Sequence, residues 1–83
     1  LFNQPLDKWN VSNVKNMSFM FNESEFNQNI NAWDVSSVED MSYMFFYSKY
    51  SKSLASWKPA KLKKYIGIFD RSEVVKPRWF SKL

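Results

Sequence analysis

The chain repeats itself every 24 residues, and this period constrains its fold more than any other feature. Residues 2–25 and 26–49 are identical at 12 of 24 positions without a gap. A third, more divergent copy at residues 50–73 keeps the apolar positions, with Trp57 in place of Trp33 and Phe69 in place of Phe45. One such unit cannot bury its own apolar face, so successive units are expected to stack on one another.

The pattern within one unit predicts a short strand, a turn and a short helix. Trp9 and Val11 alternate with polar neighbours, which is typical of a strand. Asn16 then precedes apolar residues at helical spacing over residues 17–21, and Asp40 precedes residues 41–45. Asn and Asp are favourable helix N-caps because their side-chain oxygens accept free backbone N–H groups. The expected fold class is therefore an α/β repeat, with a parallel sheet on one face of three 24-residue coils.

If the units stack, each side chain should lie over the side chain at the same position of the neighbouring unit. The expected columns are Trp9, Trp33 and Trp57, and Phe21, Phe45 and Phe69. Two interpretations of these aromatic side chains compete, namely core packing and a stacking platform for carbohydrate or bases. In every unit these residues occupy positions that are predicted to point inward, which favours the interpretation as core packing.

The repeat strings themselves are distinctive. FNQPLDKWNVSNVKNMSFMF and FNQNINAWDVSSVEDMSYMF resemble the repeats of BspA-like leucine-rich-repeat surface proteins, strongly over residues 2–48 and more weakly over 49–73. The resemblance implies a right-handed, leucine-rich-repeat-like solenoid on a protein that is displayed on the cell surface or secreted. It implies recognition of a protein or glycan ligand, and it carries over no catalytic residue.

The expected organisation is one solenoid over residues 1–83, with repeats at 2–25, 26–49 and 50–73 and a C-terminal cap at 74–83. In the cap, Val75, Trp79 and Phe80 are expected to cover the open end of the core. Because Leu1 lies inside a patterned stretch without an initiator Met, we expect a fragment, the C-terminal part of a longer protein. Its exposed N-terminal edge could self-associate.

Several kinds of chemistry are excluded by composition. The chain has no Cys and no His, and Gly67 is its only glycine. Disulfides, Cys/His zinc sites, thiol or histidine catalysis and Gly-rich phosphate loops are therefore excluded. No apolar run approaches the 18 residues or so of a membrane span. We expect a protein that is not an enzyme, holds no cofactor or metal and contains no nucleic-acid-binding module.

Charge is divided unevenly along the chain. Residues 1–48 carry a net charge of −4 and residues 49–83 a net charge of +8, which together give the total of +4. Such asymmetry can indicate an anionic partner, here nucleic acid or an acidic glycan. The candidate anion-binding residues are Lys61, Lys63, Lys64 and Arg71. The competing interpretation is a solvated cap in which lysines protect an exposed edge.

A second candidate surface consists of outward positions of the predicted strands, which differ between the copies. These positions are Asp7, Lys8, Asn10, Asn31, Asp34 and Lys58. Variation over a constant core is typical of a broad binding face in repeat proteins, but it also arises from ordinary surface drift. The sequence thus favours a non-enzymatic binding module for a protein or glycan, with binding of an anionic polymer as the alternative.

Overall fold

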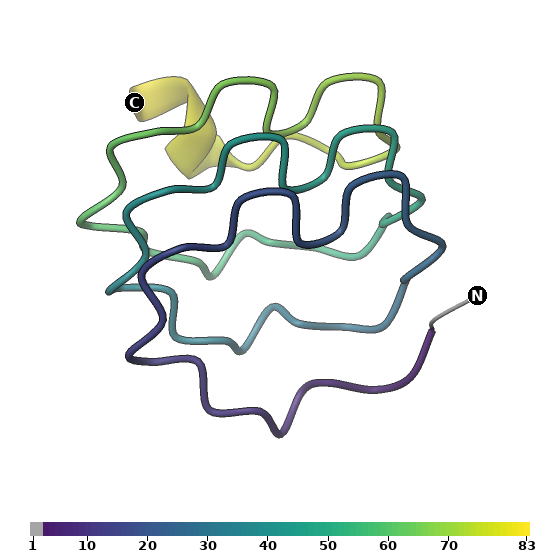
Figure 1. Ribbon diagram of the computed structural model, residues 1–83, viewed down its shortest axis with the longest axis horizontal. Helices are drawn as coiled ribbons and strands as arrows, with labels where there is room; N and C mark the ends of the chain where they lie inside the picture. Colours follow the sequence, from purple (N-terminus) through teal and green to yellow (C-terminus); the bar gives the residue numbers. More distant parts are fainter. Residues whose placement is uncertain (1–2) are drawn as a thin grey trace.

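Three turns of the chain lie one above another in the computed structural model, which describes residues 3–83 (Figure 1). We name them coil 1 (residues 3–25), coil 2 (26–49) and coil 3 (50–73), followed by the C-terminal segment (74–83). Phe2, which opens the first predicted repeat, and Leu1 lie outside the described residues. The molecule measures 30 × 27 × 20 Å, and most hydrogen bonds between coils join residues 23 to 27 positions apart.

The predicted α/β architecture is wrong. Within residues 3–83 the only regular helix is the 3-10 helix η1 (Arg78–Lys82), and no sheet forms. Two isolated parallel bridges, Asn16 to Asp40 and Asp40 to Lys64, are all that corresponds to the expected parallel sheet. The chain is therefore not a leucine-rich-repeat-like solenoid with one strand and one helix in each coil.

Two successive tight turns replace the helix that was predicted at residues 17–21. The N–H of Met20 donates to the carbonyl of Met17, and the N–H of Ser24 donates to that of Phe21. The third residue of each turn, Phe19 and then Glu23, has a positive φ, of 61° and 54°. A left-handed residue cannot continue a right-handed helix. Coils 2 and 3 repeat both turns, which form the paired humps along one side of the molecule (Figure 1).

The hydrogen-bond pattern between the coils explains why these turns form no sheet. Alternate N–H groups of coil 1, from Met17 to Glu23, donate to carbonyls of coil 2, at N···O distances of 2.7–3.0 Å. The intervening N–H groups close the local turns or bind Asn16, so they are not available to a neighbouring coil. Coil 2 donates to coil 3 in the same way. Between residues 17 and 23 the ladder runs in one direction, and only at its two ends does coil 2 donate back, from Glu39, Asp40 and Lys49 to carbonyls of coil 1. Each strand of a parallel sheet, by contrast, both donates to and accepts from its neighbour along its length.

The predicted N-cap residues accept N–H groups, but in turns rather than at helix ends. Asn16 Oδ1 accepts from the backbone N–H of Ser18 at 2.8 Å, and Asp40 Oδ1 accepts from that of Ser42 at 2.9 Å. An Asn or Asp side chain that binds the backbone two residues later closes an Asx turn. The Asn and Asp residues therefore indicated the local hydrogen bonds correctly, but the element that these bonds close is a turn and not a helix.

Aromatic rings at 24-residue spacing form the centre of the core. The rings of Phe21 and Phe45 are stacked with centroids 5.6 Å apart, and those of Phe45 and Phe69 with centroids 5.8 Å apart. All three side chains are buried, which confirms this predicted column. Tyr50 is also buried in the core. Its hydroxyl donates to the carbonyl of Ser53, and burial raises the pKa of this phenol.

Indole groups join successive coils at a second column. Trp33 Nε1 donates to the carbonyl of Leu6 at 2.9 Å, and Trp57 Nε1 donates to that of Ile30 at 3.0 Å. Each carbonyl also accepts the backbone N–H three residues later in its own coil. Trp33 and Trp57 are buried, as predicted, but Trp9 is 55% exposed. The expectation of three inward tryptophans is therefore wrong for Trp9, whose indole has no acceptor among the described residues.

The C-terminal segment covers the far end of the core. Trp79 is stacked on Trp57 at a centroid distance of 6.3 Å, and its Nε1 donates to the carbonyl of Leu54 at 2.9 Å. Phe80 packs edge-on against Phe69 at 5.1 Å. Val75 is 81% exposed, so the prediction that it covers the core is wrong.

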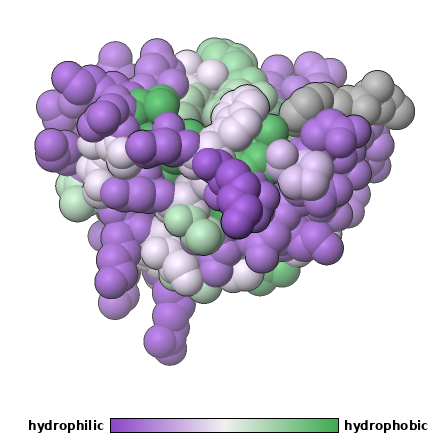
Figure 2. Space-filling model, turned by 90° about the horizontal axis from the view of Figure 1, so that it is seen from below, coloured by the Kyte–Doolittle hydropathy of each residue, from purple (hydrophilic) through white to green (hydrophobic). Residues whose placement is uncertain are grey.

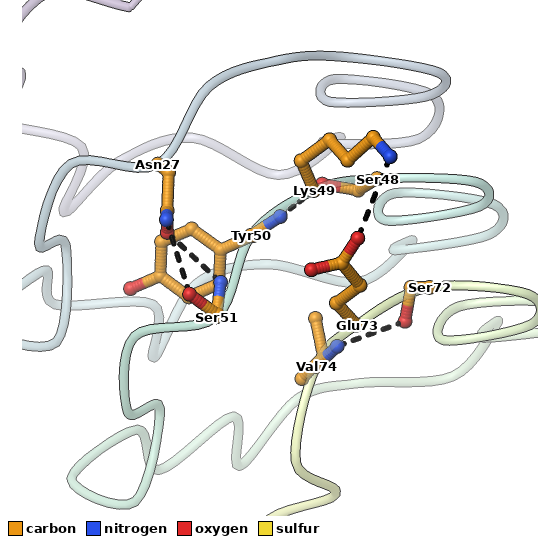
Figure 3. A network of polar contacts seen from close by, with 8 residues as sticks. All are labelled: Asn27, Ser48, Lys49, Tyr50, Ser51, Ser72, Glu73 and Val74. Atoms are coloured by element: carbon orange, nitrogen blue, oxygen red, sulfur yellow. Dashed lines mark hydrogen bonds and ion pairs between the residues drawn. The ribbon is translucent and has the colours of Figure 1, made fainter.

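Small polar side chains form hydrogen bonds on the side of the stack where one coil leads into the next (Figure 3). Asn27 Oδ1 accepts from the backbone N–H of Ser51 at 2.9 Å, and Asn27 Nδ2 donates to the hydroxyl of Ser51 at 3.0 Å. The buried hydroxyl of Ser48 accepts from the backbone N–H of Tyr50. Such side chains provide partners for backbone groups where no sheet does so.

Candidate functional site

The most distinctive surface feature is a group of four aromatic side chains outside the core. We call Phe19, Tyr43, Phe46 and Tyr47 the aromatic ridge. Phe19, Tyr43 and Tyr47 occupy left-handed turn positions, with φ between 55° and 61°. These turns project from the stack on one side (Figure 1). Phe19 is 56% and Tyr47 48% exposed, whereas Tyr43 and Phe46 are half-buried.

The rings of the aromatic ridge are in direct contact with one another. Phe19 is stacked on Tyr43, with centroids 5.2 Å apart and planes inclined by 19°. Phe46 meets Tyr43 edge-on at 5.7 Å and Tyr47 edge-on at 4.9 Å. Rings that contact one another lose fewer conformations on binding, because they are already restrained in the free protein. The ridge is therefore a preorganised apolar surface that spans coils 1 and 2.

Gly67 of coil 3 makes room for one of these rings. It lies 24 residues after Tyr43 and shares its left-handed backbone, with φ of 66°. A Cβ atom at this position would lie 2.5 Å from Cε1 of Tyr43. The single glycine of the chain therefore allows the Tyr43 ring to lie against the backbone of coil 3.

A cation extends the aromatic ridge onto coil 3. The guanidinium carbon of Arg71 lies 5.6 Å from the ring centroid of Tyr47, and Arg71 Nη1 donates to the hydroxyl of Tyr47 at 3.0 Å. The cation–π contact and the hydrogen bond hold this guanidinium against the ring. Its remaining N–H groups face no acceptor among residues 3–83, so they are available to a ligand.

The six residues that were predicted as a sheet face do not form one, because residues 3–83 contain no sheet. All of them lie at the surface, and two take part in local turns. Asn10 Oδ1 accepts from the backbone N–H of Ser12, and Asp34 Oδ1 accepts from that of Ser36, both at 3.0 Å. The hydrogen bonds from the hydroxyl and the N–H of Ser36 lower the pKa of Asp34. The other four residues are Asp7, Lys8, Asn31 and Lys58.

Asn31 is a connection between coils rather than a free binding group. Its Oδ1 accepts from the backbone N–H of Ser56 at 3.0 Å, and its Nδ2 donates to the hydroxyl of Ser56 at 3.1 Å.

The side of the molecule that contains residues 3–10 is mostly hydrophilic, with small separate apolar patches (Figure 2). A shallow depression of about 360 Å³ there includes Asp7. No aromatic side chain of the described residues 3–83 lines it.

The four predicted anion-binding residues are not brought together either. Lys63 and Lys64 line a depression of about 200 Å³ that also contains Glu39 and Asp40. These carboxylates oppose the approach of an anion. The hydrogen bonds from the backbone N–H and the hydroxyl of Ser42, and to a smaller degree the charge of Lys64, lower the pKa of Asp40. Arg71 is held by Tyr47, and Lys61 is exposed outside this depression.

The aromatic ridge was missed because the inward phase of the repeats favoured core packing over a stacking platform for the aromatic residues. One signal was available. Phe46 and Tyr47 directly follow the residues at i, i+3 and i+4 that define the apolar phase of each unit. Aromatic residues outside that phase are candidates for exposure, because the core is already filled by Phe45 and its counterparts.

An apolar depression of about 530 Å³ lies on the open face of coil 1, and it is lined by Trp9, Val11, Met17 and Met20 among others. In coils 2 and 3 the corresponding surface is covered by the preceding coil.

Within residues 3–83 no three carboxylates lie close enough to hold a metal ion. The same residues contain no helix with the length and apolar character needed to cross a membrane.

The family model described as Mycoplasma protein of unknown function, DUF285, matches residues 1–81. No curated protein and no solved structure matches the sequence significantly.

Proposed function

Because the chain belongs to the DUF285 family, whose description states no activity, we propose its function from the residues at its surface. The chain is a non-enzymatic recognition module that binds a protein or glycan ligand through the aromatic ridge. The observation that carries this proposal is the mutual contact of four aromatic side chains that remain outside a complete core. The similarity of the repeats to those of BspA-like surface proteins supports display on the cell surface or secretion. It is also the basis for regarding recognition as the role.

The composition of the ridge supports binding energetically. Tyr and Arg are enriched among the residues that dominate binding free energy at protein interfaces, and aromatic side chains supply large contact areas at little cost in conformational entropy. Tyr47 and Arg71 are joined before any ligand arrives. A ligand that covers the exposed part of Phe19 and Tyr47 would remove apolar surface from water, which contributes roughly 25 cal/mol per Å².

A binding panel tests this proposal. The chain would be immobilised and exposed to purified extracellular proteins and to a glycan array. Saturable binding of at least one ligand is expected, and a Phe19→Ser/Tyr47→Ser variant should weaken it about tenfold or more, since each lost aromatic anchor costs at least 1 kcal/mol. Ile66→Ser is the matched control, because this side chain is 68% exposed and is not one of the four ridge residues.

Two outcomes would contradict the proposal. One is the absence of saturable binding across the whole panel. The other is a ligand that binds the Phe19→Ser/Tyr47→Ser variant as tightly as the unaltered chain, because recognition would then use another surface.

A further inference from the structure

A groove separate from the aromatic ridge lies where the C-terminal segment crosses coil 3. It is lined by residues 51–55 and 75–78 and has a volume of about 370 Å³. We call it the basic groove. Neither stretch contributes to the aromatic ridge, so a ligand in the groove would be bound independently of the ridge.

The charged groups that line the basic groove all have the same sign. Lys52, Lys76 and Arg78 line it, and no Asp or Glu does. The closest carboxylate in sequence, Glu73, forms an ion pair with Lys49 at 3.5 Å (Figure 3). Lys63 and Lys64 line two other depressions. In one of about 200 Å³ two carboxylates offset the lysines, and in one of about 390 Å³ these two lysines are the only charged lining residues among residues 3–83. Three cations and no acidic lining residue create a local positive potential that attracts anions. One of these cations, Lys76, also lies over the Phe80 ring, with Nζ 5.9 Å from the ring centroid.

The backbone adds a donor to the same groove. At the corresponding step of coils 2 and 3, the N–H groups of Asn27 and Ser51 donate to the Oδ1 atoms of Asn3 and Asn27. In the C-terminal segment the corresponding residue is Val75. Ser51 stands where the earlier coils have Asn, and no residue among 3–83 accepts the N–H of Val75. A backbone N–H beside three cations is suited to an anionic oxygen.

The other lining residues narrow the class of ligand. Ser51 and Ser53 supply hydroxyl groups at the rim, and buried Leu54 and Pro77 form an apolar floor. No aromatic side chain lines the groove. Single-stranded nucleic acids are usually held by stacking of their bases on aromatic rings, and the groove offers no such ring. Sulfate and carboxylate groups require only positive charge and hydrogen-bond donors.

We propose that the basic groove binds the sulfate or carboxylate groups of an acidic polysaccharide. Lys52, Lys76 and Arg78 contact the anionic groups, and the hydroxyl groups of Ser51 and Ser53 contact the sugar. This site is different from the lysine set that the sequence suggested. It was not found from sequence because its two sides are 20 or more residues apart and meet only after the C-terminal segment has folded back over coil 3.

The test measures binding of the full chain to heparin, to hyaluronate, which carries carboxylates only, to neutral dextran and to a single-stranded DNA oligonucleotide. Heparin or hyaluronate is expected to bind and dextran is not. Three charge contacts should make the affinity fall by roughly tenfold or more between 50 and 300 mM NaCl. The two acidic polysaccharides together distinguish sulfate from carboxylate recognition.

Two triple variants with the same net charge determine the location of binding. Lys52→Gln/Lys76→Gln/Arg78→Gln should weaken binding at least tenfold, and Lys61→Gln/Lys63→Gln/Lys64→Gln should change it less than twofold. All six side chains are exposed, so folding is expected to be preserved, and thermal unfolding of both variants checks this. The Phe19→Ser/Tyr47→Ser variant should bind as the unaltered chain does, which separates this site from the aromatic ridge.

The proposal is overturned if neither acidic polysaccharide binds, or if both triple variants lose affinity equally, because binding would then follow net charge alone. It is also overturned if the DNA oligonucleotide binds more tightly than both polysaccharides and loses that binding in the groove variant.

Discussion

The replacement Trp57→Phe tests whether the indole connections between coils stabilise the fold. Trp57 is 1% exposed, and its Nε1 donates to the carbonyl of Ile30. Phenylalanine keeps an aromatic ring but removes this donor. The carbonyl of Ile30 still accepts the backbone N–H of Trp33 at 3.1 Å, so it is not left without a partner. The loss of the hydrogen bond should therefore cost about 1 kcal/mol.

The smaller ring adds a second loss of similar size. Replacing a buried indole by a phenyl group leaves a small cavity and reduces buried apolar surface, which costs about 1 kcal/mol. The total expected decrease in the free energy of unfolding is about 2 kcal/mol, on the assumption that the two losses add. In a chain of 83 residues this corresponds to a fall in Tm of roughly 8–16 °C.

The matched control is the same replacement two repeats earlier in the stack. Trp9→Phe changes a side chain that is 55% exposed and has no indole acceptor within residues 3–83. Its effect should stay within about 0.5 kcal/mol. Urea unfolding followed by the fluorescence of the remaining tryptophans measures both variants. Equal destabilisation by the two replacements would refute the reasoning, because Trp57 differs from Trp9 both in its hydrogen bond to the preceding coil and in its burial.

Three further predictions concern the turns. Gly67→Ala should lower the free energy of unfolding by about 1–2 kcal/mol, since alanine disfavours a φ of 66° and its Cβ would collide with the Tyr43 ring. An unchanged free energy of unfolding in urea would contradict this prediction. Glu23→Gly should be more stable than Glu23→Ala by about 1 kcal/mol, because Glu23 has a φ of 54°, and equal stabilities would argue against a left-handed turn. The pKa values of Asp34 and Asp40 are lowered on folding, so their contribution to stability is present at neutral pH and is lost as the pH falls below about 4. Urea unfolding from pH 7 to pH 2 should show a smaller loss of stability in the Asp34→Asn/Asp40→Asn variant, and an identical loss would exclude these carboxylates as its cause.

The stacking of aromatic residues could be predicted from the sequence because it depends only on the period. Phe21, Phe45 and Phe69 keep an aromatic ring every 24 residues, and the rings stack at 5.6 and 5.8 Å. This inference needs no knowledge of the backbone conformation between them. Burial of Trp33 and Trp57 followed from the same period.

The backbone conformation could not be predicted in this way, because local preference and tertiary hydrogen bonding conflict. Apolar residues at i, i+3 and i+4 suit a helix, and residues such as Phe19 and Tyr43 rarely adopt a positive φ. They adopt it here because the turns direct alternate N–H groups to the next coil. The stabilisation comes from residues 23 positions away, which a local pattern does not reveal.

The aromatic ridge was missed for a related reason. Tyr43 and Phe45 are two positions apart, and both belong to aromatic columns, but the left-handed turn points one outward and leaves the other inside. The positive φ at Tyr43 accompanies the outward position of its ring. Side-chain type and spacing alone contain no information about that sign.

The one-directional ladder also has a consequence for symmetry. Within residues 3–83, the carbonyls of Asn16, Ser18, Met20 and Asn22 on the open side of coil 1 accept no N–H group. At the other end of the stack, the N–H groups of Tyr65, Gly67, Phe69 and Arg71 have no acceptor in the described part of the chain. A two-fold symmetric pair of molecules joined at either of these margins would set carbonyl against carbonyl or amide against amide. The paired turns are thus polarised from one end of the stack to the other, and hydrogen bonding along these turns can match only unlike ends.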